Sequence, residues 1–231
     1  MGPPLYVPAL TFGRCVPARS GVPSPIMTAT SLIRLPIGTR DGVVFDVVAW
    51  GPSHADVDFS VACMFEHELG DGMAGGLLAL DQALGGQLSR LRAAGAFRAQ
   101  PLETLLITSP PPAVVPRAVL VIGLGDPALL DGEMLRRACR VAMCEAIRFG
   151  AVSMAFAPSV LDAGHTNNAA LDMQNVMLDG MLGALRAEHM LAEAGLAAAP
   201  SLRHCTFDVG APRAQAAGRA FADAFARLAG T

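Results

Sequence analysis

Residues 118–126 read AVLVIGLGD, five aliphatic residues followed by a Gly-Leu-Gly-Asp segment. A short, near-continuous apolar run predicts a strand at 118–123 that is covered on both faces, as in parallel or mixed sheets. Asp131 then offers an N-cap for a helix over residues 132–149, with Glu133 in its first turn, and Gly150 ends that helix. This strand, turn and helix form the α/β unit around which we interpret the rest of the chain.

The same alternation extends in both directions along the sequence. We predict further strands at residues 43–50, 59–65, 103–108, 151–157 and 204–209, and helices at residues 77–94, 169–194 and 211–228. Prolines between 108 and 118 favour a loose antiparallel pairing of 103–108 with 118–123, both as central strands. Gly85 and Gly86 cost the helix at 77–94 about 1 kcal/mol each relative to alanine. The pattern predicts an α/β fold, a mixed sheet with helices on both faces.

Composition and charge narrow the function classes. The chain has 231 residues, and we expect a proline-rich irregular tail at 1–30 and one domain at 31–231, with Met1 or Met27 as the native start. A net charge of −3 argues against a nucleic-acid partner, and no apolar run is long enough for a membrane helix. Five scattered cysteines without a Cys-x-x-Cys spacing fit reduced thiols in a cytoplasm.

Lysine is absent from the chain, because all 17 basic residues are arginine. A lysine Schiff base and a P-loop lysine are therefore excluded, together with the enzyme classes that depend on them. The arginine and alanine bias is typical of a GC-rich genome. We assign no catalytic residue, no metal site and no cofactor.

Three stretches, taken in order, resemble the N-terminal domain of the leucyl (cytosol) aminopeptidase family. They are residues 80–107 (LDQALGGQLSRLRAAGAFRAQPLETLLI), 118–126 with the helix that follows, and 151–164 (AVSMAFAPSVLDAG). The resemblance covers about residues 43–228 and implies a macro-domain-like three-layer sandwich. It also implies that the peptidase chemistry belongs to a second domain, whose Asn-Thr-Asp-Ala-Glu-Gly-Arg segment and metal-binding lysine this sequence lacks.

The wider relatives by fold are macro domains, which bind ADP-ribose through glycine loops and helix N-termini. This likeness and the ends of the predicted strands give a set of candidate ligand-binding residues: Gly72, Gly75, Gly76, Gly123, Gly125, Asp126, Ser159, Asp162, Gly164 and His165. A tight strand-to-helix turn is the alternative interpretation of Gly123–Asp126. A turn-forming loop is the alternative at Asp162–His165.

Three other features have a functional and a structural interpretation. Glu66, His67, Glu68 and Asp71 could bind a metal or form a solvated acidic loop. Met173, Met177 and Met181 recur every four residues, which suits a core helix or a subunit contact. Arg136, Arg137 and Arg140 favour a solvated helix face over a DNA contact.

We therefore expect a non-catalytic, stand-alone module that binds a small, phosphate-containing ligand or serves assembly, as a homo-oligomer or with another aminopeptidase-type subunit. An alternative is binding, or hydrolysis, of ADP-ribose-type nucleotides; another is aminopeptidase activity with a separate catalytic chain. A cleft filled by Trp50, Phe65 or Phe156 would favour the assembly module, and an open cleft between the glycine loops would favour nucleotide binding.

Overall fold

The computed structural model describes residues 34–69, 72–158 and 172–229. The predicted tail at 1–30 lies outside these residues. The strands are β1 (Leu35–Arg40), β2 (Val43–Val48), β3 (Phe59–Phe65), β4 (Thr104–Ile107), β5 (Ala118–Gly125), β6 (Ser153–Ala157) and β7 (His204–Asp208). The helices are α1 (Gly75–Ala83), α2 (Gln87–Ala93), α3 (Gly132–Arg148), α4 (Met173–Glu193) and α5 (Ala214–Ala229), with 3-10 turns η2 (Pro127–Leu129) and η5 (Ala211–Arg213).

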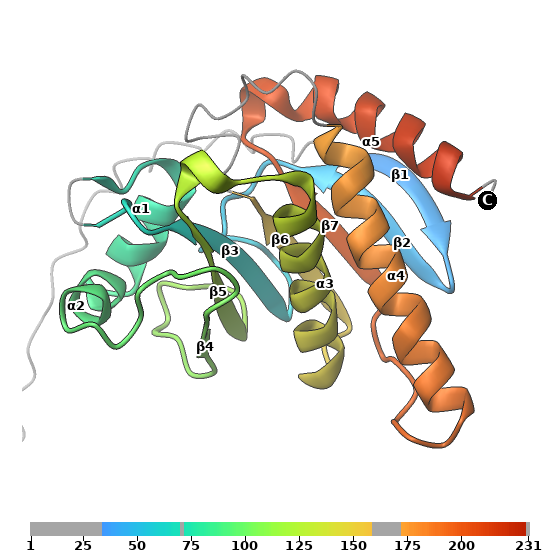
Figure 1. Cartoon of the computed structure of the whole chain (residues 1–231), viewed down its shortest axis with the longest axis horizontal. Helices are drawn as coiled ribbons and strands as arrows, with labels where there is room; N and C mark the ends of the chain where they lie inside the picture. The colour runs from blue at the N-terminus through green and yellow to red at the C-terminus, as the bar shows by residue number, and fades with distance from the viewer. Residues whose placement is uncertain (1–33, 70–71, 159–171, 230–231) are drawn as a thin grey trace, which may run out of the picture. The chain divides into compact units, whose positions relative to one another are not determined.

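Among the described residues, the strands form one sheet in the order β1-β2-β7-β6-β3-β5-β4 (Figure 1). The five inner strands are parallel to one another, while β1 and β4 pair antiparallel at the two margins. The mixed sheet and the antiparallel pairing of β4 with β5 confirm the prediction. Parallel strands end at the same edge, so the carboxyl ends of β2, β7, β6, β3 and β5 lie together.

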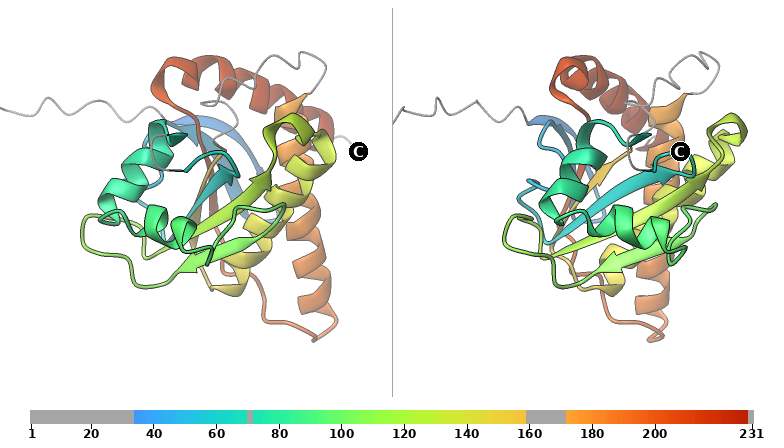
Figure 2. Two further views of the ribbon diagram at one scale, coloured as in Figure 1. Left: turned by 60° about the vertical axis from the view of Figure 1, so that its left-hand side comes forward. Right: turned by 90° about the vertical axis from the view of Figure 1, so that its left-hand side faces the viewer.

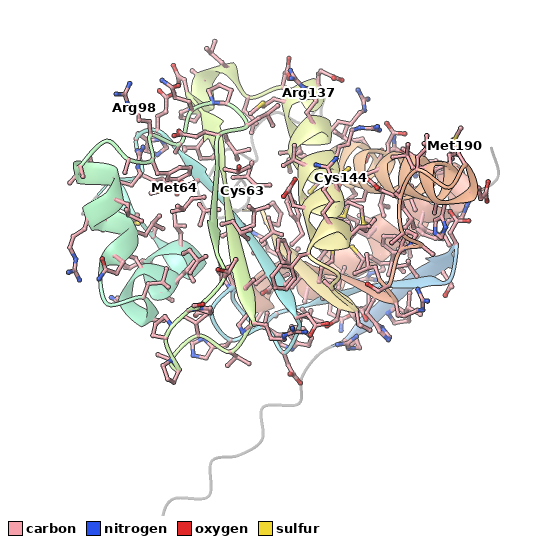
Figure 3. The ribbon with its side chains drawn as sticks, turned by 90° about the horizontal axis from the view of Figure 1, so that it is seen from below. Cys63, Met64, Arg98, Arg137, Cys144 and Met190 are labelled. Carbon is pink, nitrogen blue, oxygen red and sulfur yellow. The ribbon has the colours of Figure 1, made fainter. Side chains whose placement is uncertain are left out.

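Helices cover both faces of the sheet, which makes the three predicted layers (Figures 1 and 2). The larger core lies between the sheet and α3, α4 and α5, and the smaller one lies between the sheet and α1 and α2. Side chains alternate between the two faces along a strand. Neighbouring residues of β3 show this: Cys63 points toward α3 and Met64 toward α1 and α2 (Figure 3).

Three sequence predictions differ from the structure, and one strand was missed. The helix at 77–94 is wrong as one helix, because Gly85 and Gly86 both adopt positive φ (66° and 75°) and separate α1 from α2. The strand at 103–108 is an edge strand rather than a central one. Strand β1 was not predicted. The first three residues of the helix at 211–228 form η5 instead, where Pro212 occupies the turn.

The predicted N-cap of α3 is confirmed, and Cys63 and Cys205 are buried thiols. Asp131 caps α3, because its Oδ1 accepts a hydrogen bond from Met134 N at 2.7 Å. Burial raises the pKa of the Cys63 and Cys205 thiols, so both are neutral packing groups. No helix of the described residues has the length and apolar character that crossing a lipid bilayer requires.

The close approach of α3 and α4 depends on Gly180. A Cβ at this position would lie 2.4 Å from the carbonyl oxygen of Arg136 and 3.1 Å from Cys139 Cβ. At Gly183, one turn further along α4, a Cβ would meet only the flexible end of Arg140, at 3.6 Å. The two glycines of one helix therefore differ in what alanine would cost.

Gly180→Ala is expected to lower the free energy of unfolding by about 1–3 kcal/mol, because α3 and α4 must move apart. Gly183→Ala is the matched control. It should raise the free energy of unfolding by up to about 1 kcal/mol, because alanine has a higher helix propensity than glycine. Urea denaturation of both variants measures the difference. Equal effects of the two substitutions would contradict the packing of α3 on α4.

Asp58 joins the amino ends of three strands. Its carboxylate accepts hydrogen bonds from Val152 N at 2.8 Å and Ser153 N at 3.3 Å, and lies 3.2 Å from Arg117 Nη1. Burial acts to raise the pKa of this carboxyl, but the hydrogen bonds from Val152, Arg117 and Ser153 outweigh it and leave the pKa below its ordinary value. Folding is therefore linked to ionisation of Asp58.

Asp58→Ala should destabilise the protein at neutral pH by about 1–3 kcal/mol, since hydrogen bonds to a charged group are lost. Because the folded pKa is lowered, this contribution is present above about pH 4 and disappears as the pH falls through the folded pKa. Thermal unfolding between pH 3 and 7 should show wild type and variant converging in acid. Asp56→Ala, in the same turn but exposed, should stay close to wild type throughout.

Candidate functional site

A pocket of about 90 Å³ opens at the carboxyl edge of the sheet, where ligands bind in open α/β sheets. It is lined by Gly51, Pro52, Gly76, Leu77, Ala157, Pro158, Asp208 and Gly210. These residues follow β2, end β6 and β7, and begin α1. The parallel pairing of β2, β7 and β6 brings three of these segments to one place, and α1, which follows the neighbouring strand β3, adds the fourth.

The first turn of α1 forms one wall. Its N-cap, Ala74, provides no side-chain hydrogen bond, and the turn contains no acidic residue. The first backbone N–H groups of any helix lack acceptors within the helix and suit an anion. Gly76 lets this turn approach the loop after β2, because a Cβ there would lie 2.8 Å from Pro52 Cδ.

Asp208, at the end of β7, brings a carboxylate to the same pocket. The residue is 6% exposed, and its Oδ1 accepts a hydrogen bond from Trp50 N at 2.9 Å. This bond holds the chain after β2 against β7. Asp208 was not among the predicted site residues. Its position could have indicated it, because an acidic residue at the end of a predicted strand lies at the carboxyl edge of the sheet.

An ion pair supports this region from the same face of the sheet. Asp46 of β2 pairs with Arg34 and accepts a hydrogen bond from Thr206 Oγ1 at 2.7 Å. The Arg34 guanidinium also lies over the Trp50 ring, 5.1 Å from its centroid. Trp50 is therefore held from both its backbone and its ring.

Gly72, Gly75 and Gly76 lie before or at the start of α1, and of these Gly76 lines the pocket. Gly75 has a φ of 55° and begins the helix. Gly72 packs against the preceding turn, where a Cβ would lie 2.9 Å from the carbonyl oxygen of His67. The structure therefore brings part of the first predicted glycine loop to the pocket.

Gly123, Gly125 and Asp126 lie at the end of β5, and none of them lines the pocket. A Cβ on Gly123 would lie 2.2 Å from the carbonyl oxygen of Gln100, and one on Gly125 would lie 2.7 Å from Pro101 Cγ. Asp126 caps η2 by accepting a hydrogen bond from Ala128 N at 2.9 Å. These residues form a tight turn that packs on the segment before β4.

The third predicted group, Ser159, Asp162, Gly164 and His165, lies outside the described residues. The chain enters that group directly after Pro158, which lines the pocket.

The three other candidate features have structural roles. Glu68 is buried, and its Oε2 accepts a hydrogen bond from Phe65 N at 2.7 Å. Within the described part of the chain, no three His, Cys, Asp or Glu side chains gather as a metal site. Met177 and Met181 are buried in the larger core, which confirms the core interpretation for these two side chains. Arg136 pairs with Asp179 and Glu133 on the helix surface.

Comparison with known proteins agrees with this fold. Residues 64–173 match the model of the cytosol aminopeptidase family, N-terminal domain. The Trypanosoma brucei macrodomain has 19% identity, a TM-score of 0.55, and a match over 84% of this chain and 71% of its own. The Oceanobacillus iheyensis macrodomain with ADP has 12% identity, a TM-score of 0.60, and 86% and 97% coverage.

A mutant of tomato leucine aminopeptidase also matches, with 14% identity and a TM-score of 0.58. The match covers 85% of this chain but only 38% of the tomato enzyme, so the chain corresponds to a minor part of that protein. No curated protein matches the sequence. The macro-domain-like fold and the resemblance to the aminopeptidase N-terminal domain are thus confirmed.

Gly123→Ala tests the structural role of the β5 turn. The added Cβ overlaps the backbone of residues 99–101, so the free energy of unfolding should fall by about 1–3 kcal/mol or more. For a domain of this size each kcal/mol lowers Tm by about 2–4 °C, which thermal unfolding resolves. A variant as stable as wild type would contradict the packing of Gly123 on residues 99–101. The β5 turn would then again be a candidate ligand site.

Proposed function

Because residues 64–173 match the model of the cytosol aminopeptidase family, N-terminal domain, we propose that the chain is a non-catalytic ligand-binding module of this type. Its ligand, in this proposal, is a nucleotide of the ADP-ribose class. The binding site is the pocket between the start of α1 and the end of β7.

The observation that carries the proposal is the chemistry of the two walls. Gly76 and Leu77 belong to a helix N-terminus, which attracts phosphate oxygens through backbone N–H groups and the helix dipole. Asp208 attracts hydrogen-bond donors and repels phosphate. A ligand with a diphosphate and an amino or hydroxyl group satisfies both walls, whereas inorganic phosphate satisfies only one.

The aromatic side chains that could have filled such a cleft lie elsewhere. Phe65 and Phe156 are fully buried in the larger core, and the Trp50 ring lies against Arg34. None of the three is in the described lining of the pocket. A cleft that these three side chains leave unfilled favours ligand binding over a purely architectural module.

The solved relatives support the class of ligand. The Trypanosoma brucei macrodomain has been solved with ADP and with ADP-ribose, at 20% identity to this chain in both cases. Pockets that bury a whole small-molecule ligand usually measure about 300–1,000 Å³. At about 90 Å³, the described pocket is of a size to receive one portion of a dinucleotide-sized ligand.

The described lining favours binding over catalysis. It combines glycine, proline, alanine and leucine with a single titratable side chain, that of Asp208. Nucleophilic and general acid–base mechanisms need paired groups within hydrogen-bond reach of each other.

We further propose a cytoplasmic location, where the buried thiols of Cys63, Cys139 and Cys205 stay reduced.

Isothermal titration of ADP-ribose into the full chain, with and without a divalent cation, tests the proposal. Asp208→Asn keeps an acceptor for Trp50 N but removes the charge, so it should weaken binding at least about tenfold. Asp126→Asn, which removes an equal charge at the end of β5, should bind like wild type. Adenosine and ribose 5-phosphate should each bind more weakly than the whole ligand.

The pocket is supported as the binding site if saturable binding is lost in Asp208→Asn and retained in Asp126→Asn. The opposite pattern would move the site to the end of β5. Absence of both heat and thermal shift with ADP-ribose would overturn the nucleotide proposal.

A further inference from the structure

The two margins of the sheet differ in how they are protected (Figure 1). Margin strand β1 contains Pro36, has an irregular register between Pro36 and Gly38, and is bracketed by Arg34 and Arg40. Proline, bulges and charges are the usual devices that keep an edge strand from pairing with another chain. Margin strand β4 reads Thr-Leu-Leu-Ile and has none of them within its own bounds, and Glu103 is the charge that precedes it.

The outer side of β4 is open to hydrogen bonding. β4 pairs with β5 through Thr104–Ile107. Across the described residues, no other backbone hydrogen bond reaches residues 104–108 from any element. Half of the N–H and C=O groups of an edge strand point outward, so β4 offers the pattern that an added strand completes.

The side chains of β4 are apolar on both faces of the sheet. Leu105 and Ile107 are partly buried against the smaller core, beside α1 and α2. Leu106 lies opposite Leu120, whose side chain belongs to the larger core, so Leu106 is on the α3 side. Nothing in the described chain covers it fully, and it remains 42% exposed.

We propose that β4 pairs antiparallel with β4 of a second copy of this chain, about a two-fold axis at Leu106. Residues directly opposite each other in an antiparallel pair lie on the same face, so Leu106 meets its own copy and Leu105 meets Ile107. The opposed pairs within residues 104–108 are then all neutral, and Glu103 faces Ser109, so like charges do not face each other. Such self-complementarity is what an isologous dimer contact requires.

Prolines at both ends limit the length over which two β4 strands can pair. Pro101 and Pro110 lack an N–H donor and frame residues 102–109. Leu106 is close to the middle of that window, so a two-fold axis there uses nearly all of it. A contact this short belongs with small, transient interfaces, and we expect a weak, reversible dimer.

The contact is independent of the proposed function. The pocket is built on β2, β7 and β6, and β4 lies at the margin beyond β3 and β5. Ligand binding and dimer formation are therefore expected to be separable, and failure of either leaves the other standing.

Sedimentation velocity over a concentration series tests the dimer. Wild type should shift toward twice the monomer mass as concentration rises. Leu106→Lys should remain monomeric, because each lysine would face its own copy across the axis. Leu196→Lys, a change at a 75% exposed leucine after α4, should dimerise like wild type. Far-UV circular dichroism confirms that each variant is folded.

A cross-linking experiment fixes the register, in a background in which Cys15 and Cys144 are serine. Leu106→Cys should form a disulfide dimer under mild oxidation, since opposed Cβ atoms lie about 4.5–5.5 Å apart. Thr104→Cys should not, because its copy lies four residues away along the strand, about 13 Å. Monomeric wild type at every concentration, or equal cross-linking of the two variants, would overturn the proposal.

Discussion

The parallel alignment of β2, β7, β6, β3 and β5 is the constraint on which the rest of the structure depends. At the amino end, Asp58 ties the start of β3 to β6 and to Arg117 beside β5. At the carboxyl end, Asp208 ties β7 to the chain leaving β2. Two carboxylates thus hold opposite ends of the same sheet, and the pocket lies at the end held by Asp208.

The inner strands were predictable because they are apolar on both faces. The run at residues 118–122 is the plainest case, and β5 is buried along its whole length. β1 escaped prediction because Pro36 and Gly38 break its apolar pattern. β4 looked central because its Leu-Leu-Ile run is as apolar as that of a buried strand. Only the tertiary arrangement leaves one side of it open.

The candidate site was predictable in part, and for a related reason. In the sequence, a glycine beside a strand or at the start of a helix looks the same whether it faces a ligand or packs against another segment of the chain. Gly76 lines the pocket, whereas Gly123 and Gly125 pack on residues 99–101. That packing joins segments distant in sequence, so local pattern could not separate the two cases. Asp208 lies at the pocket because β7 pairs with β2, and these two strands are also distant in the sequence.

The contact between Gly76 and Pro52 has an evolutionary consequence. The Pro52 ring occupies the space that a side chain at position 76 would need. A larger residue can therefore enter at 76 only when a smaller one replaces the proline, or when the loop after β2 moves away from α1. Among proteins descended from a common ancestor with this chain, the two positions should change together, although 23 intervening residues separate them in the sequence.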